Sequence, residues 1–268
     1  MTTGTTRQAA APPERGKHVL LGVFAHPDDE SLLAGGVLAR HAATGATTAV
    51  VTMTWSPTSS RAAELSEALR VLGAGEPRML GYGDARNPRA APGRPRLLDA
   101  PLDEVVAAVT GEIRAVRPDV VITHDALGQL TGHPDHRRTH QVVLLAVQDA
   151  AHRRLHPEAG APWQVGSVYC ATHPASGVAD LGPLMRSVGK EVLSVEDSLV
   201  TTTVDVTPWQ QRKWEAIRAH RGEVAGERAL PGLLDRLDEE ARSRILRTEH
   251  FIRLAPGPCP DDPHRPAW

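Results

Sequence analysis

Short apolar runs alternate with segments of helical spacing along most of this 268-residue chain. The clearest strand candidates are HVLLGVFA (18–25), TTAVVTMT (47–54) and PDVVITHD (118–125). Each is a continuous apolar run that ends in a polar loop, as buried parallel strands do. The segments 30–44 and 61–72 have helical spacing and are followed by Gly45 and Gly73, residues that favour helix ends. The alternation predicts an α/β fold, a Rossmann-like and mostly parallel sheet with helices on both faces.

The rest of the chain continues this pattern. We expect strands at 77–83, 165–173 and 199–206, and helices from Asp99 or Pro101 to Val116 and over 134–155, 208–221 and 233–247. The organisation that follows is a disordered leader (1–17), a single domain with a C-terminal addition of helices and strand (18–254), and a loosely ordered tail (255–268).

Composition excludes several classes of protein. A net charge of −2 argues against a nucleic-acid-binding protein. Cys170 and Cys259 lie far apart, so neither a disulfide scaffold nor a cysteine zinc finger is indicated. There is no apolar run long enough to span a bilayer and no signal-peptide pattern. We therefore expect a cytoplasmic enzyme without nucleic-acid or membrane partners, and leave open whether it forms a homo-oligomer.

Two short clusters of histidine and aspartate follow two of the expected strands. AHPDDE (25–30) comes directly after the first strand, and GHPDH (132–136) follows the strand at 118–125. In open α/β sheets, ligands bind outside the carboxyl ends of the strands, so both clusters lie where a site is expected. A catalytic zinc ion usually takes three protein ligands from His, Asp and Glu and keeps one position open for water. Together the clusters predict a metal site.

Each cluster also has a purely structural interpretation. Asp28 or Asp29 could cap the helix that follows, because Asp is a favoured N-cap residue. His133 and His136 could lie on a solvated helix start. Either cluster alone is compatible with these roles, and their shared position at one end of the sheet favours the metal site.

The two motifs resemble those of the PIG-L/LmbE-like superfamily of zinc-dependent deacetylases. That superfamily includes N-acetylglucosaminyl-phosphatidylinositol de-N-acetylases, the N-acetylglucosaminyl-inositol deacetylase of the mycothiol pathway, and deacetylases of antibiotic biosynthesis, a branch of secondary metabolism. Two more stretches carry the resemblance: RAAELSEALRVLG (61–73), similar to an Arg-x-x-Glu helix, and LGYGD (80–84), similar to a loop with a substrate-contacting Asp. The resemblance implies one Zn²⁺ per chain, with Fe²⁺ or Co²⁺ as alternatives for such a donor set.

The family pattern implies a role for each matching residue of the two motifs. His26, Asp29 and His136 would be the metal ligands. Asp28 would be the general base, and His133 would be the general acid or the group that stabilises the oxyanion.

Five further residues would surround this centre. Asp135 and His124 are expected to support the ligands from behind, with Asp135 orienting a histidine through its ring N–H. Arg61, Asp84 and His220 would contact the sugar of the substrate.

The implied reaction is hydrolysis of an N-acyl group, normally acetyl, from an amino-sugar conjugate. Zinc lowers the pKa of a bound water from about 15.7 toward about 7, and this activated water would attack the amide carbonyl with Asp28 as base. The departing amine needs a proton, because an amide nitrogen anion is a very poor leaving group. Asp28 and His133 can both deliver it, and the sequence leaves the choice open.

The chain departs from the family pattern in places that affect the substrate. Leu130 and Thr131 stand where the mycothiol branch often has Tyr, and AHRGE (219–223) keeps only His220 of a His-x-Ser-Gln motif. Two alternatives therefore remain: an amidase acting on a larger thiol-type or antibiotic conjugate, and an inactive metal- or carbohydrate-binding homologue. The free carboxylate of Asp28 argues against the inactive homologue. His140, one helical turn after His136, is an alternative ligand or a supporting residue.

Overall fold

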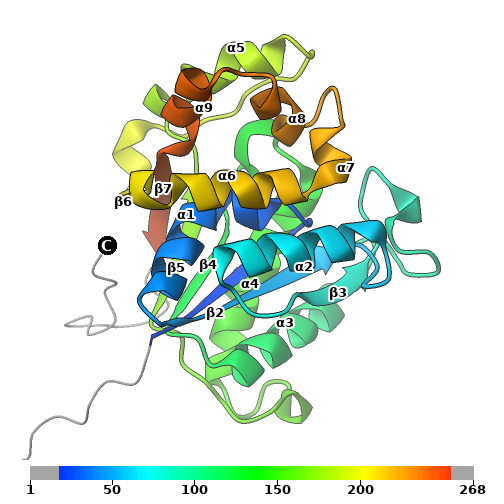
Figure 1. Ribbon diagram of the computed structural model, residues 1–268. Helices are drawn as coiled ribbons and strands as arrows, with labels where there is room; N and C mark the ends of the chain where they lie inside the picture. The colour runs from blue at the N-terminus through cyan, green and yellow to red at the C-terminus, as the bar shows by residue number, and fades with distance from the viewer. Residues whose placement is uncertain (1–17, 255–268) are drawn as a thin grey trace, which may run out of the picture.

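The molecule is built around one seven-stranded sheet in the order β3-β2-β1-β4-β5-β7-β6 (Figure 1). A computed structural model describes residues 18–254. The strands are β1 (Val19–Phe24), β2 (Thr47–Thr54), β3 (Arg78–Tyr82), β4 (Val120–His124), β5 (Ser167–Thr172), β6 (Thr202–Asp205) and β7 (Thr248–Leu254). The expected leader (1–17) and tail (255–268) lie outside the described residues.

Strands β1 to β5 pair in parallel, whereas β7 runs antiparallel to both of its neighbours, β5 and β6. The mostly parallel, Rossmann-like sheet predicted from the sequence is thereby confirmed. The chain leaves β1 toward β2 on one side and reaches β4 on the other side, so the strand order reverses between β1 and β4. The carboxyl ends of strands at such a reversal are the usual ligand site of open α/β sheets.

Helices cover both faces of the sheet, as predicted (Figure 1). They are α1 (Asp29–Ala43), α2 (Ser60–Leu72), α3 (Leu102–Val116), α4 (Pro134–Ala151), α5 (Leu181–Arg186), α6 (Gln210–Ala219), α7 (Arg221–Val224), α8 (Leu230–Asp235) and α9 (Glu239–Leu246). Against the sheet, side chains of α1, α2 and α6 share one hydrophobic core, and those of α3 and α4 share the other. A third, smaller cluster joins α6, α8 and α9. None of the helices within residues 18–254 is long and apolar enough to cross a membrane.

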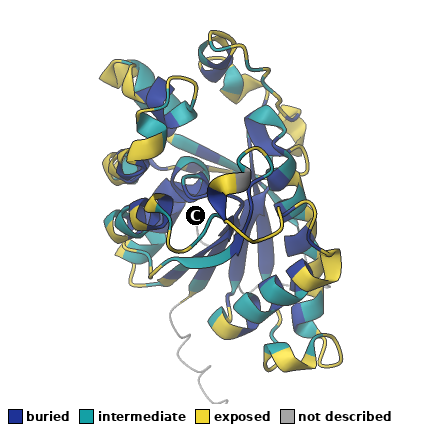
Figure 2. Cartoon of the chain, turned by 90° about the vertical axis from the view of Figure 1, so that its right-hand side faces the viewer, coloured by how far each residue is buried: buried dark blue, intermediate teal, exposed yellow. Residues whose placement is uncertain are grey.

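The two cores follow from the alternation of side chains along buried strands. On β1, Leu20 and Phe24 enter the core under α1, and Leu21 and Val23 enter the core over α3 and α4. Figure 2 shows the sheet as the continuous buried region of the molecule, with exposed residues on the outer sides of the helices. This double burial explains why the strands appear in the sequence as continuous apolar runs.

Two of the expected helices have different bounds in the structure. The helix expected over 134–155 ends at Ala151. There the buried Arg114 guanidinium donates to carbonyl oxygens of the helix end, including that of Ala150 at 3.2 Å. The single helix expected over 233–247 is wrong, because the segment forms α8 and α9. Asp238 separates them: its side chain caps α9 by accepting a hydrogen bond from Ala241 N at 2.7 Å.

Strand β7 was not expected, because a buried charge interrupts its apolar pattern. Glu249 is 3% exposed and Lys213 of α6 is 2% exposed, and their side chains form an ion pair of 2.7 Å. The Glu249 carboxylate also accepts hydrogen bonds from Gly36 N (2.8 Å) and Val37 N (3.0 Å) in α1. A buried charge is stable only when paired and hydrogen-bonded in this way, so Glu249 fixes β7, α1 and α6 to one another.

We expect Lys213→Met to lower the free energy of unfolding by about 3–5 kcal/mol, because it leaves the Glu249 charge buried without its cation. Urea denaturation measures this change. Arg70→Met is the control, since the Arg70 side chain is 71% exposed in its pair with Glu67 and should leave the urea midpoint almost unchanged. Equal midpoints for the Lys213 and Arg70 variants would show that the buried pair contributes nothing.

Candidate metal centre and active site

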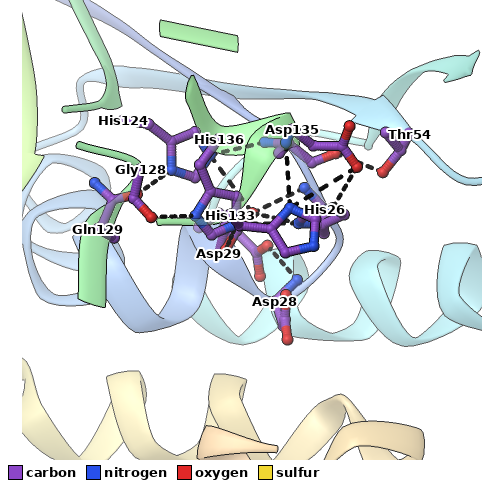
Figure 3. Close-up of polar contacts among 12 residues, drawn as sticks. His26, Asp28, Asp29, Thr54, His124, Gly128, Gln129, His133, Asp135 and His136 are labelled. Carbon is purple, nitrogen blue, oxygen red and sulfur yellow. Dashed lines mark hydrogen bonds and ion pairs between the residues drawn. The ribbon is translucent and has the colours of Figure 1, made fainter. Parts of the chain in front are cut away.

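Two loops at the carboxyl ends of β1 and β4 build the candidate site (Figure 3). The first loop turns sharply after β1, and Asp28 takes φ = 124° there before α1 begins at Asp29. The second loop leads into α4, whose first turn carries Asp135 and His136. Because β1 and β4 are neighbours, residues more than 100 positions apart meet at one point.

Donor atoms of three residues converge between these loops. His26 Nδ1 lies 3.2 Å from Asp29 Oδ2 and 3.1 Å from His136 Nε2, and His136 Nε2 lies 3.3 Å from Asp29 Oδ1. Two ligands that are each about 2.0–2.1 Å from a tetrahedral zinc ion lie roughly 3.3 Å apart. The structure thus brings together the three residues that the sequence predicted as ligands, at the spacing of donors around one ion.

The hydrogen bonds of the two rings leave their lone pairs facing this point. His136 Nδ1 donates to the Gly128 carbonyl at 3.2 Å, so the neutral ring carries its lone pair on Nε2. His26 Nε2 faces the carboxylates of Asp84 and Asp135, each at 3.2 Å, so its lone pair lies on Nδ1. Two imidazole nitrogens and a carboxylate at this separation need either a shared proton or a cation between them. The donor set therefore fits a divalent metal ion.

The pKa values of His26 and Asp29 also indicate that this site favours positive charge. Burial alone would lower the pKa of His26, but hydrogen bonds to Asp135, Asp29 and Asp84 raise its pKa well above the usual value. Burial would raise the pKa of Asp29, but His136 and His124 hold it well below its usual value. The buried site carries more negative than positive charge among its described side chains, and a bound cation would offset this charge.

Other side chains near this point are engaged elsewhere. Overlapping groups that could hold an ion include His133 with His26 and His136, and His124 with Asp29 and His136. His124 accepts a hydrogen bond from Ala25 N at 2.9 Å through Nε2, and its Nδ1 is bonded to Gln129. Its ring stacks on His136, with centroids 4.1 Å apart. His124 lies behind the candidate ligand, in the place expected from the sequence.

His140 is not placed as a ligand. Its Nδ1 bonds to the carbonyl of His124 at 2.9 Å. This contact with the backbone of His124 gives His140 a supporting position.

Asp135 and Asp84 both support His26. Asp135 is fully buried, and its Oδ2 faces His26 Nε2 and accepts from Ala85 N at 2.8 Å. This is the contact with a histidine ring that the sequence suggested. Asp84 was expected to contact the sugar, but its Oδ2 faces His26 and its Oδ1 accepts from Arg86 N and Asn87 N. The structure therefore gives Asp84 an orienting position and leaves it little surface for a ligand.

Asp28 lies at the edge of the group (Figure 3). Its backbone N donates to Glu30 Oε2 at 3.0 Å, and its carboxylate lies 3.3 Å from Arg61, which also contacts Glu223 at 3.1 Å. The Arg61 guanidinium sits over the Trp55 ring, 4.6 Å from its centroid. Burial raises the pKa of the Asp28 carboxyl to about 7, and Arg61 acts in the opposite direction. Asp28 is thus a partly buried carboxylate beside the site, outside the three donors.

His133 stands at the start of α4 and caps it. Its Nδ1 accepts a hydrogen bond from Asp135 N at 3.2 Å, so the neutral ring carries its proton on Nε2. Its ring centroid lies 4.6 Å from that of His26. Burial, together with the neighbouring His26 and His136, lowers the pKa of His133 to about 3. The ring is therefore a neutral hydrogen-bond donor next to the metal centre.

His220 has a different place from the one expected. It is completely buried, and its Nε2 lies 2.8 Å from Glu30 Oε1. Glu30 in turn accepts from the Asp28 backbone and from Ser31 Oγ at 2.6 Å. The structure points to a supporting role for His220 behind the Asp28 turn, and away from the predicted contact with substrate.

Sequence reasoning missed Glu30, Gln129 and Glu223. Glu30 belongs to the AHPDDE motif, so its identity was a usable signal, whereas its partner His220 lies between α6 and α7, far along the chain. Gln129 bonds to His124 and to the Ala171 carbonyl, and Glu223 holds Arg61. No local pattern marks the last two.

Comparison with known proteins adds to this geometry. Residues 21–147 match the family model described as PIG-L: GlcNAc-PI de-N-acetylase. A relative from Rhodococcus opacus (strain B4), a 1D-myo-inositol 2-acetamido-2-deoxy-alpha-D-glucopyranoside deacetylase, is 37% identical and aligns with 87% of this chain and 90% of its own length. The matched range of the family model contains both His/Asp motifs.

Solved structures share the fold. An N,N'-diacetylchitobiose deacetylase from Pyrococcus horikoshii has a TM-score of 0.63 and 19% identity, with 89% of this chain and 84% of that chain covered. GalB, a 4-carboxy-2-hydroxymuconate hydratase from Pseudomonas putida KT2440, has a TM-score of 0.60 and 19% identity, with 90% and 98% covered. Because both a deacetylase and a hydratase have this fold, the fold alone does not decide the reaction.

Proposed function

The chain belongs to the PIG-L family, and from that membership we propose that it is a metal-dependent hydrolase that removes an N-acyl group, normally acetyl, from an amino-sugar conjugate. The observation that carries this proposal is the convergence of His26 Nδ1, Asp29 and His136 Nε2 within 3.1–3.3 Å of one another. The relative named as a deacetylase of an N-acetylglucosaminyl inositol supports the amino-sugar class of substrate.

His26, Asp29 and His136 would hold the ion. Zn²⁺ suits two imidazoles and one carboxylate, and Fe²⁺ or Co²⁺ also suit this donor set. When bound, the ion supplies a Lewis acid that makes water a nucleophile near neutral pH and polarises the amide carbonyl. Asp84 and Asp135 would keep the His26 ring oriented through its Nε2–H.

Asp28 would act as the base that takes a proton from the attacking water. It follows the metal-facing His26 by two residues, yet its carboxylate contacts Arg61 and lies outside the donor set. The ion pair with Arg61 limits the rotation of the carboxylate, which is what a positioned base needs. Its neighbour Glu30 fixes the backbone of the same turn.

His133 would stabilise the negative charge that develops on the amide oxygen. Because its Nδ1 accepts from Asp135 N, the ring proton is on Nε2, which makes it a donor for the oxyanion. A neutral imidazole has only one ring proton. If that proton is hydrogen-bonded to the oxyanion, the ring is a poor proton donor to the leaving amine. We therefore assign delivery of that proton to Asp28, which has just received one from water.

Release of acetate tests the proposed function. We expect protein loaded with Zn²⁺, Co²⁺ or Fe²⁺ to release acetate from 1D-myo-inositol 2-acetamido-2-deoxy-α-D-glucopyranoside, N-acetylglucosamine or N,N'-diacetylchitobiose. A chelator should abolish the release and added metal should restore it. Release from none of these substrates by protein that holds metal would contradict the proposal. The cytoplasmic location and any homo-oligomer stay predictions.

A further inference from the structure

The guanidinium of Arg61 lies between two carboxylates. Its Nη2 is 3.3 Å from Asp28 Oδ2 and donates to the Pro27 carbonyl, while its Nη1 is 3.1 Å from Glu223 Oε1. The ring of Trp55 lies against the guanidinium, with its centroid 4.6 Å from Cζ. Arg61 therefore divides its hydrogen-bond donors between the turn that carries Asp28 and a glutamate far along the chain.

Glu223 is held in place by the segment around it. It belongs to the short helix α7, which follows α6, and α6 packs along α2 (Figure 1). Next to it, Gly222 N donates to Oε1 of the buried Glu64 at 3.0 Å. At the start of α7, the buried ring of His220 is bonded through Nε2 to Glu30 Oε1 at 2.8 Å. These two contacts fix the backbone of Glu223 without the help of its own ion pair.

The position of the guanidinium decides which oxygen of Asp28 is open to water. Arg61 contacts Asp28 at Oδ2, so Oδ1 is the oxygen that can receive a proton. A guanidinium presents a fork of N–H groups that matches both oxygens of one carboxylate. Among residues 18–254, Asp28 and Glu223 are the two carboxylates paired with Arg61. Loss of Glu223 would therefore leave Nη1 to close on Asp28 and occupy its second oxygen.

We propose that Glu223 is a positioning residue for the base: it holds Nη1 of Arg61 and so keeps one oxygen of Asp28 free for a proton of the attacking water. The assignment rests on the proposed function, because it needs Asp28 as the base. Within the described chain, Glu223 pairs with Arg61 and with none of the three converging donors. Its loss should slow the chemical step and leave metal binding unchanged.

Two substitutions of Glu223 separate the hydrogen bond from the charge. Glu223→Ala removes the acceptor of Nη1, and we expect it to lower kcat by about 10- to 100-fold at unchanged KM, the loss typical of a reacting group displaced by about 1 Å. Glu223→Gln keeps an oxygen that accepts from Nη1 and should restore most of the turnover. Glu227→Ala, at an exposed glutamate after α7, is the control and should match wild type.

The values of kcat are taken per metal-loaded chain, so that a fraction of unfolded protein does not lower them. Wild-type kcat in Glu223→Ala would overturn the proposal. A raised KM at normal kcat would overturn it as well, because Glu223 would then contact the substrate. An equal loss in Glu223→Gln and Glu223→Ala would show that the charge matters and not the held guanidinium.

A double-mutant cycle tests whether Glu223 acts through Arg61. Arg61→Met removes the guanidinium and keeps an apolar side chain against Trp55. In this background, Glu223→Ala should change kcat by less than about twofold, because no guanidinium is left to hold. Equal losses of kcat with and without Arg61 would show that Glu223 acts independently, and would overturn the proposal.

A crystal structure of metal-free Glu223→Ala gives a readout that does not depend on turnover. We expect the two Nη groups of Arg61 to contact the two oxygens of Asp28. A guanidinium that keeps its wild-type position, with Nη2 alone on Asp28, would overturn the proposal. Failure of the proposed function is a different result, because metal-loaded wild-type protein would then release no acetate whatever the position of Arg61.

Discussion

Replacing His136 with alanine is expected to remove both the bound metal and the hydrolase activity. His136 supplies one of three converging donors, and its ring is fixed by Gly128 on one side and stacks on His124 on the other. Loss of a residue that only supports a ligand costs about 10–100-fold in metal affinity. Loss of a ligand should cost more than that, because two donors cannot complete a tetrahedral site.

Metal analysis of the purified variant, together with titration calorimetry, measures this effect. His152→Ala is the matched control, since His152 is an exposed histidine at the end of the same helix. It should keep both metal and turnover. Full metal occupancy in His136→Ala would show that the third ligand is another residue, and His133 or His124 would then be the next candidates.

Asp28→Asn is expected to keep the metal and to lower kcat by about 10²- to 10⁴-fold, the range typical of general acid–base catalysis. Asn has nearly the same shape as Asp but cannot take a proton from water. It also tolerates positive φ better than most residues, which matters at φ = 124°. Alanine at this position combines the same chemical loss with added backbone strain, so Asn is the cleaner substitution.

Steady-state kinetics separate kcat from KM, and metal analysis shows whether the site is intact. Asp103→Asn, an exposed aspartate in the first turn of α3, is the control for the loss of one negative charge. Normal turnover of Asp28→Asn would remove Asp28 from the mechanism. A variant without metal would instead make Asp28 a structural part of the turn.

The first two thirds of the fold could be predicted because its signals are local. Strands β1, β2 and β4 are continuous apolar runs, and Gly73, with φ = 76°, marks the end of α2. The C-terminal third was harder. Its strand β7 carries the buried Glu249, whose partner Lys213 lies 36 positions away. No local sequence pattern predicts such a pair.

The same distinction applies to the site. His26, Asp29 and His136 were recognisable because two compact motifs follow adjacent strands. The expected sugar contacts of Asp84 and His220 depended on where each side chain points, and the structure turns Asp84 toward His26 and His220 toward Glu30. Side-chain direction of this kind is decided by long-range packing, which a single sequence does not display.

An ion held between the β1 and β4 loops would join positions 26 and 136, and so close a loop of 110 residues. Such a ligand binds the folded chain and not the unfolded one, so it adds to stability by an amount that rises with the logarithm of its free concentration. The concentration of free metal in the cell would then set how large a loss of stability by substitution the fold tolerates. A substitution tolerated by the loaded protein could expose the same chain to proteolysis when metal is scarce.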